Sequence, residues 1–178
     1  MGNAIVRRDP VQLDTLEDLL TFADVMAKSG MFADIKIAAH AVVKIAAGRE
    51  LGIPPMVSLG KIHIIEGKPV IAPELMAAKI KESGQYDYRI KQLDEKGCVL
   101  EFWHLGIVIG ESSFTMQDAI KAELNTRATW KRYFRNMFFA RAMSNGARWY
   151  CAGVIGGAYI PEEMGATVNE EGEVVTVQ

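Results

Sequence analysis

The residues with the clearest chemical potential are the cations of "WKRYFRNMFFARAMSNGARWY", residues 130–150. This segment contains no Asp or Glu and carries Lys131, Arg132, Arg135, Arg141 and Arg148. Between residues 121 and 160, seven cations accompany one acidic residue, Glu123. This part therefore has a charge of +6 and leaves −8 for the rest of a chain whose formal net charge is −2. Such a partition is typical of a polyanion site on an otherwise acidic protein.

A single helix over about residues 128–151 would gather most of these cations on one side. At about 100° per residue, four cations and one amide fall within an arc of about 140°, with Arg132 outside it. The five residues in the arc are Lys131, Arg135, Arg141, Asn145 and Arg148. An arc of this width can follow a phosphate backbone.

Two interpretations of this helix are open. It is either a surface helix whose arginine stems cover Phe134 and Phe138, or a phosphate-binding helix. A surface helix usually interleaves Glu at i,i+4 spacing to pair with its cations, and this one has none, so we favour phosphate binding. Its aromatic side chains could stack on bases, but aromatics at helical spacing more often belong to a core. We favour the core for Trp130, Tyr133, Trp149 and Tyr150.

Other chemistries lack their residue patterns. The Gly-Lys pairs at 60–61 and 67–68 lack the flanking residues of a phosphate-binding loop, which argues against ATP-driven work. Glu101 and His104 could form an acid-base pair, but a separation of three puts them on opposite faces of a strand. The histidines are scattered, and Cys98 and Cys151 are too few for a disulfide framework. We therefore expect no catalytic residue, no metal site and no cofactor, and we do not expect an enzyme.

The elements that would position the cations belong to an α+β fold. Helical spacing predicts helices over residues 13–28 and about 35–51. A hairpin over 61–72 turns at 66–68, and Pro73 opens a helix that ends at Gly84. Three further strands follow at 86–94, 98–106 and 107–114, and Thr115 caps a helix with Asp118 three residues on. The sequence thus predicts an antiparallel hairpin and a three-stranded sheet packed with helices, followed by a long basic helix.

The composition is typical of one globular domain, with 49% hydrophobic and 24% charged residues. We expect a single domain over residues 1–163 and a flexible acidic tail over 164–178. Neither a membrane span nor an apolar stretch of signal-peptide length is visible, which favours a cytoplasmic protein.

The basic segment and its successor "GVIGGAYIPEE" resemble the phage RecT and Red-beta family of single-strand annealing proteins. In that family a tryptophan opens a basic helix that ends in Ala-Arg before a Gly-Tyr-acidic turn. Upstream, "AAGRELGIPPMVSLGKIHIIEGKPVIAPELMAAKIKESG" is similar to the family's other shared region, with an Ala-rich helix, a break, a hairpin and a helix ending in Ser-Gly. The resemblance covers roughly residues 36–163.

The resemblance implies an ATP-independent recombinase that coats single-stranded DNA and anneals it to a complement, as an oligomeric ring or helical filament. It implies a phage exonuclease or the host single-strand binding protein as partner. The DNA-binding positions that it implies are Trp130, Arg135, Arg141, Asn145 and Arg148, and, at the hairpin, Lys61 and Lys68; Lys131 joins them from the helical arc.

In the expected mechanism, Arg135, Arg141 and Arg148 hold the phosphates of one strand in a groove between the long helix and the hairpin, and the base edges stay free for a second strand. Two other classes are open. One is a DNA- or protein-binding accessory that does not anneal, and the other is a small-molecule or enzymatic α+β domain with a deep apolar pocket.

Overall fold

The computed structural model describes residues 13–169 and 174–176, and it has an α+β fold. The chain forms two compact units, the first ending at Gly60 and the second beginning at Lys61. The sequence predicts one domain over residues 1–163, whereas the structure has separate apolar clusters in the two units. Local patterning does not reveal such a division, because it depends on which helices share a core.

The first unit is helical. It contains α1 (Leu16–Ser29), α2 (Ala38–Glu50) and α3 (Pro55–Lys61), the last of which ends at the unit boundary. Thr15 caps α1 through a capping box with Asp18, and Gly30 ends the helix in the left-handed conformation at φ 65°. The core of this unit is apolar except for the buried residues Ser58 and Lys44. The ammonium group of Lys44 donates to the Leu59 carbonyl and to Asp34. Burial lowers the pKa of Lys44.

The second unit begins with the predicted hairpin. Strand β1 (Ile62–Ile65) pairs antiparallel with β2 (Lys68–Ile71), and the two turn residues Glu66 and Gly67 have φ values of 51° and 74°. Positive φ at both central residues is what a two-residue type I′ turn requires. Helix α4 (Pro73–Glu82) follows and starts with proline, as predicted.

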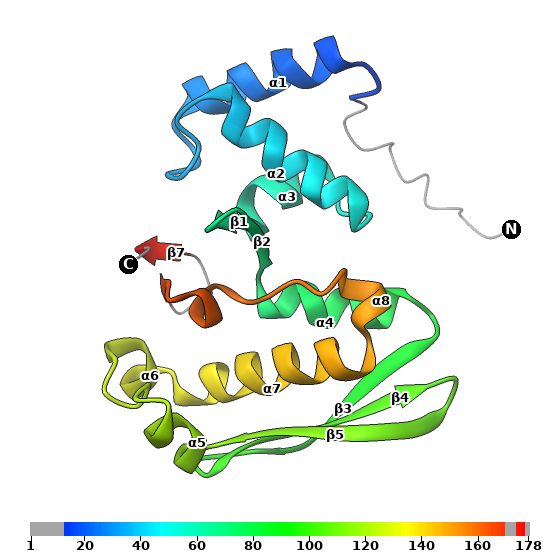
Figure 1. The fold of residues 1–178 in the computed structure, drawn as a ribbon, viewed down its shortest axis with the longest axis vertical. Helices are drawn as coiled ribbons and strands as arrows, with labels where there is room; N and C mark the ends of the chain where they lie inside the picture. The colour runs from blue at the N-terminus through cyan, green and yellow to red at the C-terminus, as the bar shows by residue number, and fades with distance from the viewer. Residues whose placement is uncertain (1–12, 170–173, 177–178) are drawn as a thin grey trace, which may run out of the picture. The chain divides into compact units, whose positions relative to one another are not determined.

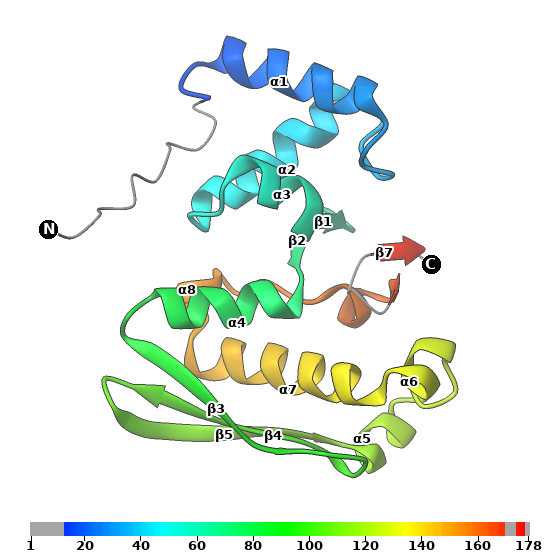
Figure 2. The same ribbon diagram turned by 180° about the vertical axis from the view of Figure 1, so that it is seen from behind.

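The predicted three-stranded meander is confirmed. Strands β3 (Tyr86–Leu93), β4 (Gly97–His104) and β5 (Ile107–Thr115) pair antiparallel in sequence order. On the central strand, Cys98, Leu100 and Phe102 are buried, and the alternate residues point to the other face. The long helix α7 (Phe134–Tyr150) covers the buried face, and α4 lies on the other side of α7, so this unit has three layers (Figures 1 and 2).

The expected capping box of Thr115 and Asp118 is confirmed at the start of α5 (Met116–Lys121). The single helix predicted over about 128–151 is wrong, because the chain forms α6 (Ala128–Arg132) and α7 with a break at Tyr133, where φ is −128° and ψ is 41°. In a continuous helix Trp130 and Phe138 would lie about 12 Å apart along the axis. Their ring centroids are 5.8 Å apart, and the change of direction at Tyr133 permits this approach.

After α8 (Ala152–Ile155), the chain forms a 3-10 helix, η1 (Pro161–Met164), and the strand pair β6 (Thr167–Val168) and β7 (Val174–Thr176). The sequence predicts a flexible tail from residue 164, whereas Ala166 is buried with Ile65 and Val70, and Met164 and Val174 pack against them. Residues 170–173, 177 and 178 of that tail lie outside the described residues. Across 13–169 and 174–176, no helix is long and apolar enough to cross a bilayer.

The contact between α7 and the sheet generates the first prediction. A Cβ atom on Gly146 of α7 would overlap the ring of Phe102 on β4. Because both residues are buried, Gly146→Ala should lower the free energy of unfolding by about 1–3 kcal/mol, as overpacking in a core does. Urea unfolding followed by circular dichroism measures this loss.

Gly153→Ala is the matched control, since a Cβ there meets nothing within 4 Å. It lies in helix α8, where alanine is favoured over glycine. Equal stability of the two variants would contradict the close packing of α7 on β4.

Candidate nucleic-acid interface

The predicted cations divide into two groups with different surroundings. Lys131 and Arg135 are exposed, whereas the side chains of Arg141 and Arg148 are only 16% and 21% exposed. Arg135 and Arg148 both lie on α7, about 20 Å apart along its axis. One continuous arc of cations is therefore not formed.

The less exposed group is built around Glu163, and we call Arg141, Ser144, Asn145, Arg148 and Glu163 the Glu163 cluster. Arg148 binds the Glu163 carboxylate through two hydrogen bonds of 2.6 and 2.8 Å. Ser144 donates to the same carboxylate at 2.7 Å, and Arg148 also donates to Asn145 Oδ1 at 3.0 Å. Arg141 lies 3.9 Å from Glu163 and donates to the Glu162 carbonyl at 3.2 Å.

The contacts of the Glu163 cluster argue against phosphate binding by the whole helix, because Arg141 and Arg148 already have an acidic partner. The acidic partner of Arg148 comes from η1 rather than from i,i+4 positions on α7, so the lack of Glu on the helix did not mean a lack of partners. Burial raises the pKa of Glu163, but hydrogen bonds from Arg148 and Ser144 outweigh it and leave that pKa below its ordinary value. Burial also lowers the pKa of Arg141.

Tyr159 connects the Glu163 cluster to the hairpin. The guanidinium carbon of Arg148 lies 4.8 Å from the centre of the Tyr159 ring, and Lys68 Nζ lies 5.7 Å from it. The backbone carbonyl of Tyr159 accepts a hydrogen bond of 2.9 Å from Ile71 of β2. The structure thus brings Lys68 and Arg148, two predicted site residues, to one aromatic ring. Lys61 instead pairs with Glu74 at 3.0 Å on the exposed surface.

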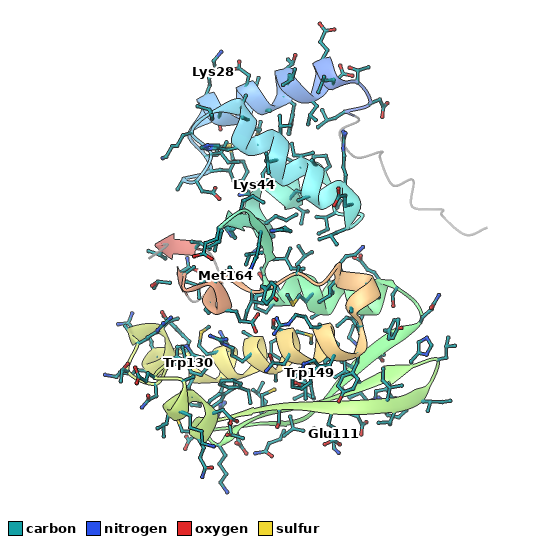
Figure 3. The ribbon with its side chains drawn as sticks, in the orientation of Figure 1. Lys28, Lys44, Glu111, Trp130, Trp149 and Met164 are labelled. Atoms are coloured by element: carbon teal, nitrogen blue, oxygen red, sulfur yellow. The ribbon has the colours of Figure 1, made fainter. Side chains whose placement is uncertain are left out.

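The aromatic residues divide as well. Trp130 is 4% exposed and contacts Phe114 and Phe138, which confirms the core interpretation for this residue and leaves it no free face for a base. For Trp149 the core interpretation is wrong, because its side chain is 61% exposed. Figure 3 shows the two tryptophans at opposite ends of the basic segment. Trp149 is exposed because only one face of α7 meets the sheet near the end of this helix, and Trp149 lies on another face.

The solvent-facing group extends beyond the predicted site. We call Arg127, Lys131, Arg132 and Arg135 the exposed cation group, since all four are exposed. Within the described part of the chain, none of the four forms a salt bridge, and Glu123 is the only acidic residue between 121 and 135. Arg127 and Arg132 are additions to the predicted site. Arg132 falls outside the arc of a continuous helix, and the break at Tyr133 removes that constraint on its direction. Arg127 could have been found from the sequence, because it belongs to the excess of cations between residues 121 and 160.

Neither the models of known protein families nor the curated protein sequences contain a match to this chain.

The Glu163 cluster generates a stability prediction. Replacing Glu163 by Gln leaves Arg141 and Arg148 partly buried without their charge partner, which costs about 3 kcal/mol of unfolding free energy. Glu95→Gln is the matched control, because Glu95 is exposed and the same chemical change there should leave stability within about 0.5 kcal/mol of the parent. Urea unfolding of the three proteins tests this, and a loss of similar size in both variants would argue against the ion pair.

The same carboxylate generates a pH prediction. The folded-state pKa of Glu163 lies below its ordinary value of 4.5, so its contribution to stability is present above pH 4.5 and is lost as pH falls through the lower folded pKa. The stability difference between parent and Glu163→Gln should therefore shrink on acidification below pH 4.5. A difference that stays constant between neutral and acidic pH would contradict this account.

Proposed function

We propose that the protein is an ATP-independent single-stranded DNA-binding and annealing protein of phage-type homologous recombination, which acts as an oligomer in the cytoplasm of a bacterial host. The observation that carries the proposal is the exposed cation group. Four guanidinium or ammonium groups within nine residues face solvent, and no described acid pairs with them. A surface of this kind recognises a chain of phosphates whatever its base sequence.

The exposed cation group is the first contact with DNA in this proposal. Arg132 and Arg135 present planar donor groups that suit phosphate oxygens, and Lys131 adds a mobile point charge. Phosphates held in this way leave most base edges free to pair with a second strand. Annealing needs no bond cleavage and no fuel, because stacking in the new duplex contributes about 1.4 kcal/mol per base step.

The Glu163 cluster has a supporting role. Its arginines are already bound within the protein, and their hydrogen bonds to Glu162 and Glu163 fix η1 against α7. Arg148 also lies over the ring of Tyr159, whose backbone carbonyl accepts a hydrogen bond from Ile71 of the hairpin. Lys68 and the exposed edge of Tyr159, which is 37% exposed, then form a second, weaker surface for a strand. This differs from the expected mechanism, in which Arg141 and Arg148 grip phosphates directly.

Oligomerisation follows from the small size of the exposed cation group. Four cations reach only a few phosphates, so tight binding to a long strand requires neighbouring copies side by side. A ring or a helical filament meets this need. A phage exonuclease that produces single strands, or the host protein that covers them, is the kind of partner such an assembly requires.

The test compares charge-matched variants in binding and annealing. If all four cations contact phosphates, the slope of log affinity against log salt should be about −3 per protomer on single strands, and Arg132→Gln should reduce its magnitude by about 0.7. Lys96→Gln removes one positive charge from the exposed turn between β3 and β4 and should leave the slope unchanged. Fluorescence anisotropy across salt concentrations gives the slopes.

Annealing of complementary oligonucleotides without nucleotide is then followed by fluorescence, with light scattering for assembly size. A variant with all four residues of the exposed cation group changed to Gln should neither bind nor anneal. Salt-dependent binding without faster annealing would point to a non-annealing accessory protein. Binding that is unchanged in the fourfold variant would refute the proposed interface.

A further inference from the structure

A cavity of about 180 Å³ lies in the second unit, between α6, the start of α7 and the segment 162–168. Trp130, Met137 and Val168 form apolar parts of its wall, and each is at most 4% exposed. Arg127 belongs to the same lining and is exposed, so it stands on the solvent side of the cavity. The volume is below the roughly 300–1,000 Å³ of pockets for drug-sized ligands, which limits an occupant to a group of about one ring.

Glu162 supplies the acidic group of this cavity. Its side chain is 7% exposed, and its Oε2 atom is fully buried without a hydrogen-bond partner among the described residues. Burial is the largest influence on this carboxyl and raises its pKa. An unpaired buried carboxylate oxygen is costly and uncommon. Its position in the wall of a cavity provides room for a ligand that donates a hydrogen.

The hydrogen bonds of the neighbouring polar groups do not satisfy this oxygen. Thr129 donates its hydroxyl hydrogen to the Val168 carbonyl at 2.9 Å. Arg141 donates through Nη2 to the backbone carbonyl of Glu162 at 3.2 Å rather than to its carboxylate, and its Nη1 lies 3.9 Å from Glu163. The Nε atom of Arg141 is buried and has no hydrogen-bond partner among the described residues. The bond from Arg141 fixes the backbone of Glu162, while the carboxylate oxygen Oε2 stays without a partner.

The part of an occupant that enters the cavity must therefore be about one ring in size and donate a hydrogen bond to a carboxylate, and the part that stays outside must tolerate the positive charge of Arg127. A simple alkylammonium ion is small enough and donates a hydrogen bond, but the positive charge of Arg127 repels it. A nucleotide satisfies all of these conditions, because its base can donate from an amino group while its phosphate lies near the guanidinium. Carboxylates accept hydrogen bonds from the cytosine N4 amino group, whereas uracil and thymine present the O4 acceptor at that position.

We infer that this cavity holds the amino-bearing edge of one base of the bound strand, with Glu162 as hydrogen-bond acceptor and Arg127 near the adjoining phosphate. The inference rests on the proposed function and adds to it a single base-selective position in an interface that is otherwise indifferent to sequence. Cytosine is preferred over uracil there, since the two rings have the same size and differ in the donor or acceptor that faces the carboxylate.

The test measures binding of homopolymeric dC and dU strands of about ten nucleotides by fluorescence anisotropy, at slightly alkaline pH and one salt concentration. The two strands have equal charge and length, so phosphate contacts cancel in the ratio of their affinities. The parent protein should bind dC about tenfold more tightly, the size expected of one hydrogen bond to a charged group. Equal affinities, or tighter binding of dU, would overturn the inference.

Three variants locate the preference. Glu162→Gln should bring the dC to dU ratio close to one, because an amide can either accept or donate. Glu95→Gln, the same change on an exposed residue outside the cavity, should keep the parent's ratio. Arg127→Ala should weaken both strands by a similar factor and preserve the ratio.

These outcomes separate the inference from the proposed function. If both strands bind with equal affinity and the expected salt dependence, the base-selective position is refuted and the proposed function stands. If neither strand binds, both fall. If the preference for dC survives in Glu162→Gln, the cavity is not its source and the inference is wrong.

Discussion

The bidentate pair of Arg148 and Glu163 is the interaction on which the arrangement of η1, Tyr159 and the end of α7 in the second unit depends. It joins the last turn of α7 to η1, and the same carboxylate also accepts from Ser144 and from the backbone of Ile160. These bonds hold Tyr159 beside both Arg148 and Lys68. Because the pair is partly buried and its hydrogen bonds are satisfied, it acts as a structural joint rather than as an open anion site.

The pair of Arg148 and Glu163 separates the cations of residues 127–148 into two groups with different surroundings. Arg141 and Arg148 neutralise an internal carboxylate, and the cations from residue 127 to residue 135 remain available to solvent. A charge count alone cannot distinguish these two uses. Under the proposed function, this distinction decides which substitutions should alter binding of a polyanion and which should alter folding.

Much of the fold followed from local patterns. The hairpin, the meander and the Thr115 cap depend on turn residues and alternation within short windows, and all three are present. The break at Tyr133 lets Trp130 pack on Phe138 and on Phe114 of β5, and helical spacing alone does not reveal this packing. The division near Gly60 depends on which helices share a core, which spacing does not reveal either. For the site, the local excess of cations was visible, but Glu163 lies 15 residues from Arg148 and Glu162 faces a cavity formed by three separate segments.

The layered packing of α7 has an evolutionary consequence. With the sheet on one side and α4 on the other, its fully exposed positions are confined to its ends, at Arg135, Asn136 and Trp149. Substitutions in the middle of this helix must preserve the volume of a packed side chain. Changes of surface charge on α7 that leave the packing intact are therefore confined to its two ends.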